Sequence, residues 1–170
     1  MKKIIVTGGS GFIGSNLVNY LIKKKYFVIN IDKLTYSSNK YFSEIRNKKN
    51  YKFFRLDINN KNKLIRIIKK FKPSGIFNLA AETHVDRSID EPRAFIHTNL
   101  NGTFSLLESL RYLQKKKIKP KLIHISTDEV YGDIKGNLRS DENYKYEPSS
   151  PYSATKAGAD HLVKSYIRTY

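Results

Sequence analysis

Four glycines directly after a short β-branched run constrain this fold more than any other feature of the sequence. Gly8, Gly9, Gly11 and Gly14 follow residues 2–7 (KKIIVT), and the next segment, FIGSNLVNYLIKKK, has apolar side chains at helical spacing. The last three glycines fit G-x-G-x-x-G, and the segment also has a glycine at every third position from Gly8. A glycine loop between a strand and a helix makes a tight turn and lets a pyrophosphate approach the helix N-terminus. The segment therefore predicts a dinucleotide-binding βαβ unit.

Strand-like and helix-like segments alternate along the rest of the chain. We expect strands at residues 2–7, 26–31, 51–56, 75–80 and 121–126, and helices from Phe12 onward and at residues 60–71, roughly 93–116 and 151–170. A short helix is expected in the polar stretch 33–50, and loops are expected at residues 81–93 and 133–149. This order predicts the α/β class, a doubly wound parallel sheet of the Rossmann fold with strand order 3-2-1-4-5. Ligands bind such sheets beyond the carboxyl ends of the strands.

Composition narrows the class of protein. The 170 residues suit a single domain. The absence of cysteine excludes disulfides and thiolate metal sites, and no apolar stretch is long enough for a bilayer or a signal peptide, so we expect a cytoplasmic protein without a membrane partner. The formal net charge is +17, but the lysines fall in short tracts that mostly close predicted helices, where cations suit the helix dipole. We interpret them as a solvated surface rather than a specific nucleic-acid site.

Two acids at strand ends are candidates for contacts to a cofactor. Asp32 lies 23 residues after Gly9, where an acid accepts hydrogen bonds from an adenosine ribose. This favours NAD over NADP, because the acid would repel a 2′-phosphate, although the adjacent Lys33 weakens that preference slightly. Asp57, after the third strand, would border the adenine or cap the next helix.

Tyr152 and Lys156 lie four residues apart at the start of the last predicted helix, so they share one face of it. A cationic lysine near a tyrosine hydroxyl lowers the pKa of the hydroxyl, and a tyrosinate can act as a base toward a sugar hydroxyl. This spacing is common on helices in general. In a chain that also has a nucleotide-binding loop, it indicates a catalytic pair.

The fifth predicted strand is followed by a hydroxyl and two adjacent acids, Thr127, Asp128 and Glu129. Adjacent carboxylates repel each other and are costly to bury. Neighbouring carboxylates in different environments can have their pKa values pushed apart, so that the pair supplies one acid and one base. The alternative is structural, with Asp128 as the cap of the next turn and Glu129 solvated.

Several segments resemble the dTDP-glucose 4,6-dehydratase family, within the extended short-chain dehydrogenase/reductase superfamily of NAD-dependent epimerases and dehydratases. They are TGGSGFIGSN, NLAAETHVDRSI, HISTDEVYGD and SSPYSATKAGADHLV, and DKLTY at residues 32–36 is similar too. The resemblance covers nearly all 170 residues, and STDEVYGD is its most specific part. Sugar-nucleotide epimerases resemble the chain elsewhere but typically lack the acid pair after the threonine.

The resemblance implies a lyase that converts dTDP-glucose to a 4-keto-6-deoxy sugar nucleotide in deoxysugar biosynthesis. Tyr152, assisted by Lys156, would take the proton of the sugar 4-hydroxyl while hydride passes from C4 to NAD. Thr127 would hold the 4-oxygen. Glu129 would remove the C5 proton and Asp128 would protonate the departing C6 hydroxyl, after which hydride would return to C6.

The resemblance also places residues around the cofactor and the sugar. The cofactor set is Gly8, Gly11, Phe12, Ile13, Gly14, Asp32, Lys33, Leu34, Thr35, Asp57, Ile58, Leu79, Ala80, Ala81, Glu82, Thr98, Tyr152 and Lys156. Thr83 and Thr127 would contact the sugar. His84 and Arg87 would have substrate-side or structural roles, and His124 is expected to be a core or interface histidine. No ligand cluster indicates a metal site.

Members of this family are longer than the present chain. We therefore expect residues 1–170 to form an incomplete NAD-binding Rossmann domain without the C-terminal substrate-binding lobe, and with an exposed sheet edge at the fifth strand. The full-length protein is expected to be a homodimer. The alternatives are another NAD-dependent sugar-nucleotide dehydratase or epimerase, an inactive truncated fragment that only binds NAD, and a non-catalytic binding or regulatory module.

Overall fold

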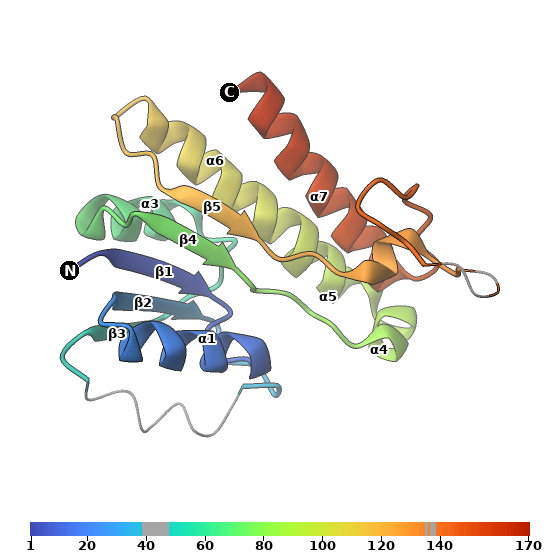
Figure 1. The fold of residues 1–170 in the computed structure, drawn as a ribbon, viewed down its shortest axis with the longest axis horizontal. Helices are drawn as coiled ribbons and strands as arrows, with labels where there is room; N and C mark the ends of the chain where they lie inside the picture. The colour runs from blue at the N-terminus through green and yellow to red at the C-terminus, as the bar shows by residue number, and fades with distance from the viewer. Residues whose placement is uncertain (39–47, 135, 137–138) are drawn as a thin grey trace. The chain divides into compact units, whose positions relative to one another are not determined.

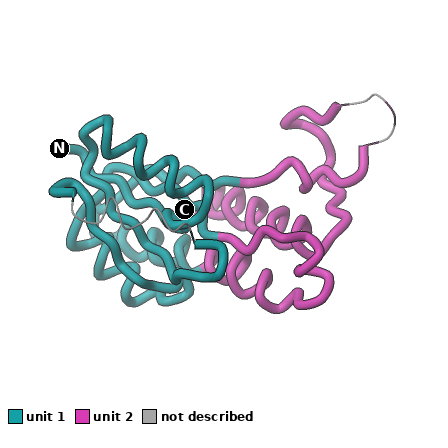
Figure 2. Tube along the Cα trace, turned by 90° about the horizontal axis from the view of Figure 1, so that it is seen from below, with its two compact units in different colours: residues 1–80, 105–125 teal, residues 81–104, 126–170 magenta. Residues whose placement is uncertain are grey.

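The chain divides into two compact units in a computed structural model that describes residues 1–38, 48–134, 136 and 139–170. Unit 1 consists of residues 1–80 and 105–125, and unit 2 consists of residues 81–104 and 126–170. Figure 2 shows the two units in different colours. The predicted short helix within residues 33–50 falls largely on residues 39–47, which lie outside the described residues.

Unit 1 contains a five-stranded parallel sheet, which confirms the predicted α/β class (Figure 1). Its strands are β1 (Lys3–Thr7), β2 (Phe27–Asp32), β3 (Tyr51–Arg55), β4 (Gly75–Asn78) and β5 (Lys121–His124). The strand order is β3-β2-β1-β4-β5, as predicted, and β5 lies at one edge of the described sheet. The last two strands are two residues shorter than predicted.

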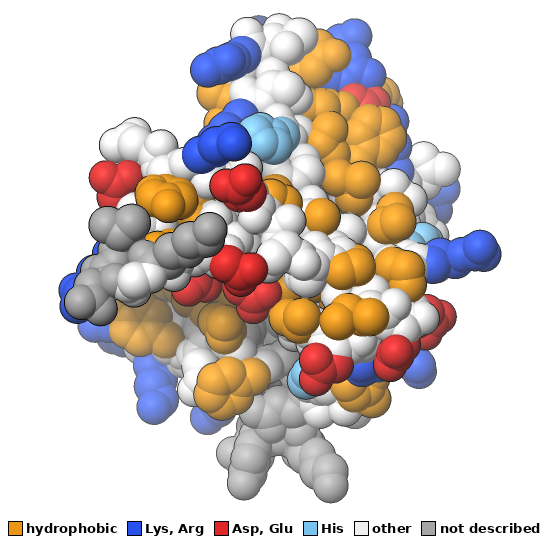
Figure 3. Space-filling view, turned by 90° about the vertical axis from the view of Figure 1, so that its right-hand side faces the viewer, with side chains coloured by type: hydrophobic (Ala, Val, Ile, Leu, Met, Phe, Trp, Pro, Cys, Tyr) orange, Lys and Arg blue, Asp and Glu red, His pale blue; other side chains and the backbone are white. Residues whose placement is uncertain are grey.

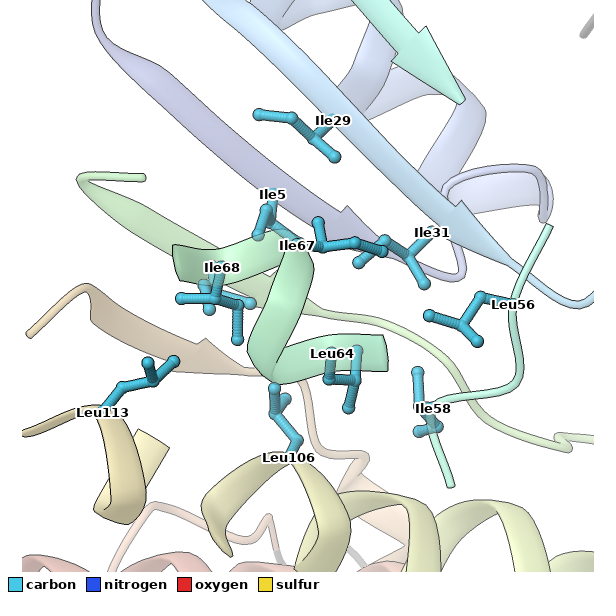
Figure 4. Close-up of a cluster of buried hydrophobic side chains, with 11 residues drawn as sticks. Ile5, Ile29, Ile31, Leu56, Ile58, Leu64, Ile67, Ile68, Leu106 and Leu113 are labelled. Carbon is cyan, nitrogen blue, oxygen red and sulfur yellow. The ribbon is translucent and has the colours of Figure 1, made fainter. Parts of the chain in front are cut away.

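Helices cover both faces of this sheet because the strands alternate their side chains between two apolar sets. Ile5 stands opposite Ile29 and Ile76 in the neighbouring strands, and all three are buried. They pack in one core with Leu64 and Ile68 of α3 (Lys61–Phe71), and α6 (Gly102–Gln114) adds further leucines (Figure 4). The opposite face holds a second core, to which α1 (Phe12–Lys23) contributes the buried side chains of Val18 and Leu21. This framework supports the loops that follow β1, β2 and β3 within unit 1.

The predicted lysine-rich ends of helices are exposed in unit 1. They include Lys23–Lys25 at the end of α1, Lys69 and Lys70 in α3, and residues 115–117 after α6. The space-filling view shows basic, acidic and hydrophobic side chains interspersed on the face that it presents (Figure 3). The exposure of the lysine tracts agrees with a solvated basic surface.

Unit 2 is helical and contains segments that follow β4 and β5 along the chain. The predicted helix at roughly 93–116 is a succession of α5 (Pro92–Phe95), a π-helical stretch (Ile96–Asn101) and α6, whose first three residues belong to unit 2. The expected loop at residues 81–93 contains a short helix, α4 (Val85–Asp90), that the sequence pattern did not predict. Within the described ranges, no helix is both long and apolar enough to cross a membrane.

The last helix, α7 (Pro151–Thr169), begins at a strong sequence signal. Ser150 is the N-cap, and its side chain and that of Ser153 form a reciprocal capping box. Pro151 occupies the first helical position, where its missing N–H costs nothing. This cap fixes the start of the helix one residue before Tyr152.

Candidate active site in two parts

The glycine loop of unit 1 is a close backbone turn that requires glycine at Gly8 and Gly14. Gly8 has φ +66°, and its N–H donates to the carbonyl of Ile31 at 2.9 Å. A Cβ on Gly14 would lie 2.1 Å from the carbonyl oxygen of Gly8. The N-cap of α1 is Gly11, so no side chain caps the helix at the point where a phosphate group would approach. This geometry fits the pyrophosphate of a dinucleotide.

Asp32, at the carboxyl end of β2, accepts hydrogen bonds from the loop after β1 and from the segment after β2. Its Oδ2 accepts the backbone N–H of Ser10 at 2.9 Å, and its Oδ1 accepts that of Leu34 at 2.8 Å. The side chain is 9% exposed. A carboxylate has about four acceptor positions, so these two bonds leave acceptor capacity for a ribose hydroxyl. Lys33 and Thr35, which also belong to the predicted cofactor set, follow Asp32 in the chain and are half-buried.

Asp57 is not a helix cap, so the capping interpretation is wrong. Its Oδ1 accepts the backbone N–H of Asn59 at 2.8 Å, and the N-cap of α3 is Asn60, whose side chain accepts from Lys63 N. The next predicted cofactor residue, Ile58, is buried in the apolar core of unit 1. That Asp57 borders the adenine of the cofactor stays a prediction.

The other predicted cofactor residues of unit 1 lie at its glycine loop and after β4. Phe12 and Ile13, at the start of α1, are 79% and 63% exposed, and Leu79 and Ala80 are half-buried. The N–H of Ala80 donates to Thr7 Oγ1 at 3.3 Å.

A polar chain crosses the end of the sheet and explains His124. Thr7 Oγ1 donates to Asn78 Oδ1 at 2.6 Å, and Asn78 Nδ2 lies 3.0 Å from His124 Nδ1. Thr7 and Asn78 are almost completely buried. His124 is half-buried and is joined by this chain to Thr7 and Asn78, which the sequence motifs did not single out.

Tyr152 is anchored in unit 2 by its backbone and its ring. Its N–H donates to Ser88 Oγ of α4 at 3.1 Å, and its ring meets that of Phe95 edge-on at 6.2 Å. The residue is 6% exposed. The unpredicted helix α4 therefore positions the predicted catalytic tyrosine.

The expected lowering of the Tyr152 pKa is wrong in this structure. Burial raises the pKa of the hydroxyl, a hydrogen bond with Thr127 opposes that rise, and the carboxylates of Glu129 and Asp128 raise the pKa further. Burial also lowers the pKa of Lys156, and the carboxylate of Asp160 acts in the opposite direction. The sequence motif gave the positions of Tyr152 and Lys156 but not the desolvation that dominates both groups.

Thr127, Asp128 and Glu129 form the start of a one-turn 3₁₀ helix, Asp128–Tyr131. Thr127 is its N-cap, with Oγ1 accepting the N–H of Glu129 at 3.3 Å, so the interpretation of Asp128 as the cap is wrong. Both acids are exposed. Thr127 thus makes a hydrogen bond with the Tyr152 hydroxyl, and the charges of the two carboxylates raise the pKa of that hydroxyl.

The segment after β4 is clamped by Asn99 of the π-helical stretch. Asn99 Oδ1 accepts the N–H of Glu82 at 2.9 Å, and its Nδ2 donates to the carbonyl of Glu82 and to Thr155 Oγ1, both at 3.0 Å. This links the predicted cofactor and sugar residues near Glu82 to α7. No local sequence motif marked Asn99.

The remaining predicted residues of unit 2 differ in exposure. Thr98 is 4% exposed, Ala81 is half-buried, and Thr83 is exposed. His84 is the N-cap residue of α4, and both it and Arg87 are exposed. Across the described part of the chain, no three His, Cys, Asp or Glu side chains gather in a way that would hold a metal.

Comparison with known protein families gives one strong match. The model of the family described as GDP-mannose 4,6 dehydratase matches residues 5–170. A dTDP-glucose 4,6-dehydratase from Neisseria meningitidis is 46% identical over 178 residues, and one from Haemophilus influenzae is 47% identical over 178 residues. The alignments cover all of this chain and 50% and 53% of those proteins, so the chain spans about half the length of the curated relatives it matches.

Solved structures agree with this result. A dTDP-glucose 4,6-dehydratase from Bacillus anthracis in complex with NAD has a TM-score of 0.86 and 40% identity, and covers 100% of this chain and 51% of its own. The Streptomyces venezuelae enzyme DesIV, with NAD bound, has a TM-score of 0.90, 37% identity, and covers 99% and 52%. A UDP-glucose 4-epimerase from Thermus thermophilus in complex with NAD has a TM-score of 0.85 and 30% identity over 99% and 51%.

Proposed function

This chain belongs to the GDP-mannose 4,6 dehydratase family, and we propose that it carries the chemistry of an NAD-dependent dTDP-glucose 4,6-dehydratase. The supporting observation is the 3₁₀ turn in unit 2, where Thr127 reaches the Tyr152 hydroxyl and the carboxylates of Asp128 and Glu129 act on it. A hydroxyl and two acids around one tyrosine are the groups that oxidation at C4 followed by elimination of water requires.

Unit 1 supports the cofactor part of the proposal. The turn at Gly8, the close approach at Gly14 and the uncapped start of α1 would hold the pyrophosphate, and Asp32 would accept the ribose hydroxyls. When bound, NAD supplies the hydride acceptor at C4 and the hydride donor at C6. We further propose that residues 1–170 form the NAD-binding Rossmann part of the enzyme.

The catalytic steps follow from the groups of unit 2. Tyr152, as its phenolate, takes the proton of the sugar 4-hydroxyl and becomes a phenol, and the ammonium of Lys156 favours the phenolate before that transfer. Thr127 donates a hydrogen bond to the 4-oxygen, which becomes the carbonyl. Glu129 then removes the acidified C5 proton, and Asp128 protonates the C6 hydroxyl so that it leaves as water. The resulting double bond is reduced at C6 and protonated at C5.

The substrate and assembly are further parts of the proposal. The relatives named dTDP-glucose 4,6-dehydratase support dTDP-glucose as the substrate. We also propose a homodimer, which the exposed Ile96 and Phe104 on the succession of helices α5 to α6 support. A UDP-glucose 4-epimerase is the second candidate, because the Thermus thermophilus enzyme matches the same length of chain. The acid pair Asp128–Glu129 favours the dehydratase.

A product assay tests this proposal. The purified chain is mixed with NAD and either dTDP-glucose or UDP-glucose, and the products are followed by NMR. We expect the 4-keto-6-deoxy sugar from dTDP-glucose, and no product from the matched Tyr152→Phe variant, which keeps the ring but lacks the hydroxyl. Formation of a C4 epimer would contradict the dehydratase assignment, and no reaction with either substrate would favour the alternative of a fragment that only binds NAD.

A further inference from the structure

Asp160 is a buried acid in unit 2 that the proposed chemistry does not use. It lies on α7, one helical turn after Lys156, and is 7% exposed. A buried carboxylate is costly unless hydrogen bonds and an opposite charge compensate it. The partners of Asp160 therefore indicate why the charge is there.

Two hydroxyls from outside the helix donate to the same oxygen of Asp160. Ser126 Oγ and Tyr146 Oη both donate to Oδ2, the second at 3.1 Å. Ser126 immediately precedes Thr127, so this bond ties the acid-bearing turn to α7. The bond from Tyr146 ties the following loop to the same point.

That loop in turn supports the 3₁₀ turn from its other side. Glu147 N donates to the carbonyl of Val130 at 3.0 Å, and the rings of Tyr146 and Tyr131 meet at 5.4 Å. A Cβ on Gly132 would lie 1.9 Å from the carbonyl oxygen of Glu147, so the two segments are in close contact. The turn is thus held at both of its ends, and both attachments lead to Asp160.

The charge of Asp160 also acts on Lys156, one turn earlier on α7. Its carboxylate favours the ammonium of Lys156, whose pKa burial otherwise lowers. Burial followed by the charge and hydrogen bond of Asp160 raises the pKa of Tyr146 to about 12. The Tyr146 ring also faces Lys164 and His161.

We propose that Asp160 is a positioning residue that fixes the turn carrying Thr127, Asp128 and Glu129 against the helix carrying Tyr152 and Lys156. It acts through Ser126 and Tyr146 and touches no substrate atom in the proposed reaction. The inference rests on the proposed function for its catalytic meaning, but its geometry can be tested without turnover.

The test compares four variants with the unchanged chain by NMR. Asp160→Asn removes the charge of Asp160. Ser126→Ala removes the Ser126 hydroxyl, whereas Ser126→Thr keeps a hydroxyl there. Glu142→Gln is the control, because it removes the charge of an exposed acid. The first readout is the cross-relaxation between the Thr127 methyl group and the Tyr152 ring. The second is hydrogen exchange of the Glu129 amide, and the third is the ionisation of Tyr146 labelled in its ring.

We expect Ser126→Ala and Asp160→Asn to weaken the Thr127–Tyr152 signal and to speed exchange at Glu129 about tenfold, the effect of losing a hydrogen bond to a charged group. The pKa of Tyr146 falls in Asp160→Asn. Ser126→Thr and Glu142→Gln match the unchanged chain. The signal between Phe95 and Tyr152 should persist in every variant, because that contact does not pass through Asp160.

Two results would overturn the proposal. In one, Ser126→Ala and Asp160→Asn leave the Thr127–Tyr152 signal and the Glu129 exchange unchanged. In the other, Ser126→Ala, which adds no buried charge, also loses the Phe95–Tyr152 signal. The hydrogen bond between Ser126 and Asp160 would then support the whole of unit 2 rather than the turn. Neither readout depends on product formation, so failure of the proposed dehydratase activity is seen separately.

Discussion

The backbone N–H of Ser10 in the glycine loop donates to Asp32 Oδ2 at 2.9 Å, so the acid at the end of β2 fixes the loop that follows β1. In Asp32→Asn, an amide group would face the N–H of Ser10 or Leu34, and one bond would be lost. We expect a loss of about 1–3 kcal/mol in the free energy of unfolding, measured by urea denaturation. NAD affinity, measured by calorimetry, should fall as well. The exposed-acid variant Asp133→Asn is the control, and equal stability of the two variants would contradict this role.

Alanine substitutions of Gly11 and Gly14, at the start of α1, should have different effects on stability but similar effects on NAD binding. In Gly14→Ala the new Cβ would lie 2.1 Å from the carbonyl oxygen of Gly8, so the backbone must shift, at a cost of about 1–3 kcal/mol. In Gly11→Ala the corresponding distance is 3.4 Å, an ordinary contact, and φ is −74°. Thermal unfolding should therefore show destabilisation only in Gly14→Ala. NAD binding should weaken in both, because a Cβ at Gly11 obstructs the approach of the pyrophosphate; undiminished binding in Gly11→Ala would argue against that site.

Tyr146 should make stability fall in alkaline solution. Burial, and then Asp160, raises its pKa from 10.0 to about 12, so the folded state keeps the proton at a higher pH than the unfolded chain. This contribution to stability is complete below pH 10.0 and is lost as the pH rises through about 12. Tyr146→Phe cannot ionise, so its unfolding free energy should fall less steeply across that range. Denaturation curves at several pH values check this, with the more exposed Tyr144→Phe as control; identical slopes for Tyr146→Phe and the unchanged chain would contradict it.

The two acids of the 3₁₀ turn should affect elimination rather than oxidation. Asp128→Asn and Glu129→Gln each remove a proton-transfer group, which should slow product formation by about 10²–10⁴-fold. Oxidation at C4 depends on Tyr152 and should continue, so absorbance of reduced NAD should accumulate during the reaction. Asp133→Asn, an exposed acid two residues beyond the turn, should behave as the unchanged chain. Product formation at the normal rate in either acid variant would show that the turn does not carry the elimination.

The sequence predicted those parts of the fold that depend on local patterns. The β-branched strands, the glycine loop and the order of the sheet follow from periodicity and from residues close together in the chain. The start of α7 at Pro151 was also predicted, and in the structure it is fixed by a local cap of Ser150 and Ser153. Helix α4 was not predicted because its six residues are too few to show a helical period, and its role, the bond from Tyr152 N to Ser88, joins residues 64 positions apart.

The candidate site was predictable as a set of residue types but not as an electrostatic arrangement. Motif spacing identified Tyr152 and Lys156, yet the direction of the Tyr152 pKa shift depends on burial, which no spacing reveals. Asn99 and Asp160 were missed because their partners, Thr155 and Ser126, lie 56 and 34 positions away in the chain. Such long-range hydrogen bonds leave no periodic signal in a sequence.

The most direct test of the central claim follows one hydrogen atom. dTDP-glucose that carries deuterium at C4 is incubated with the chain and NAD, and the product is examined by NMR. If the residues around Tyr152 support oxidation, elimination and reduction on one sugar, the deuterium will appear in the C6 methyl group of a 4-keto-6-deoxy product. A product that keeps the deuterium at C4, such as the C4 epimer, or a 4-keto-6-deoxy product without deuterium in its methyl group would contradict the account.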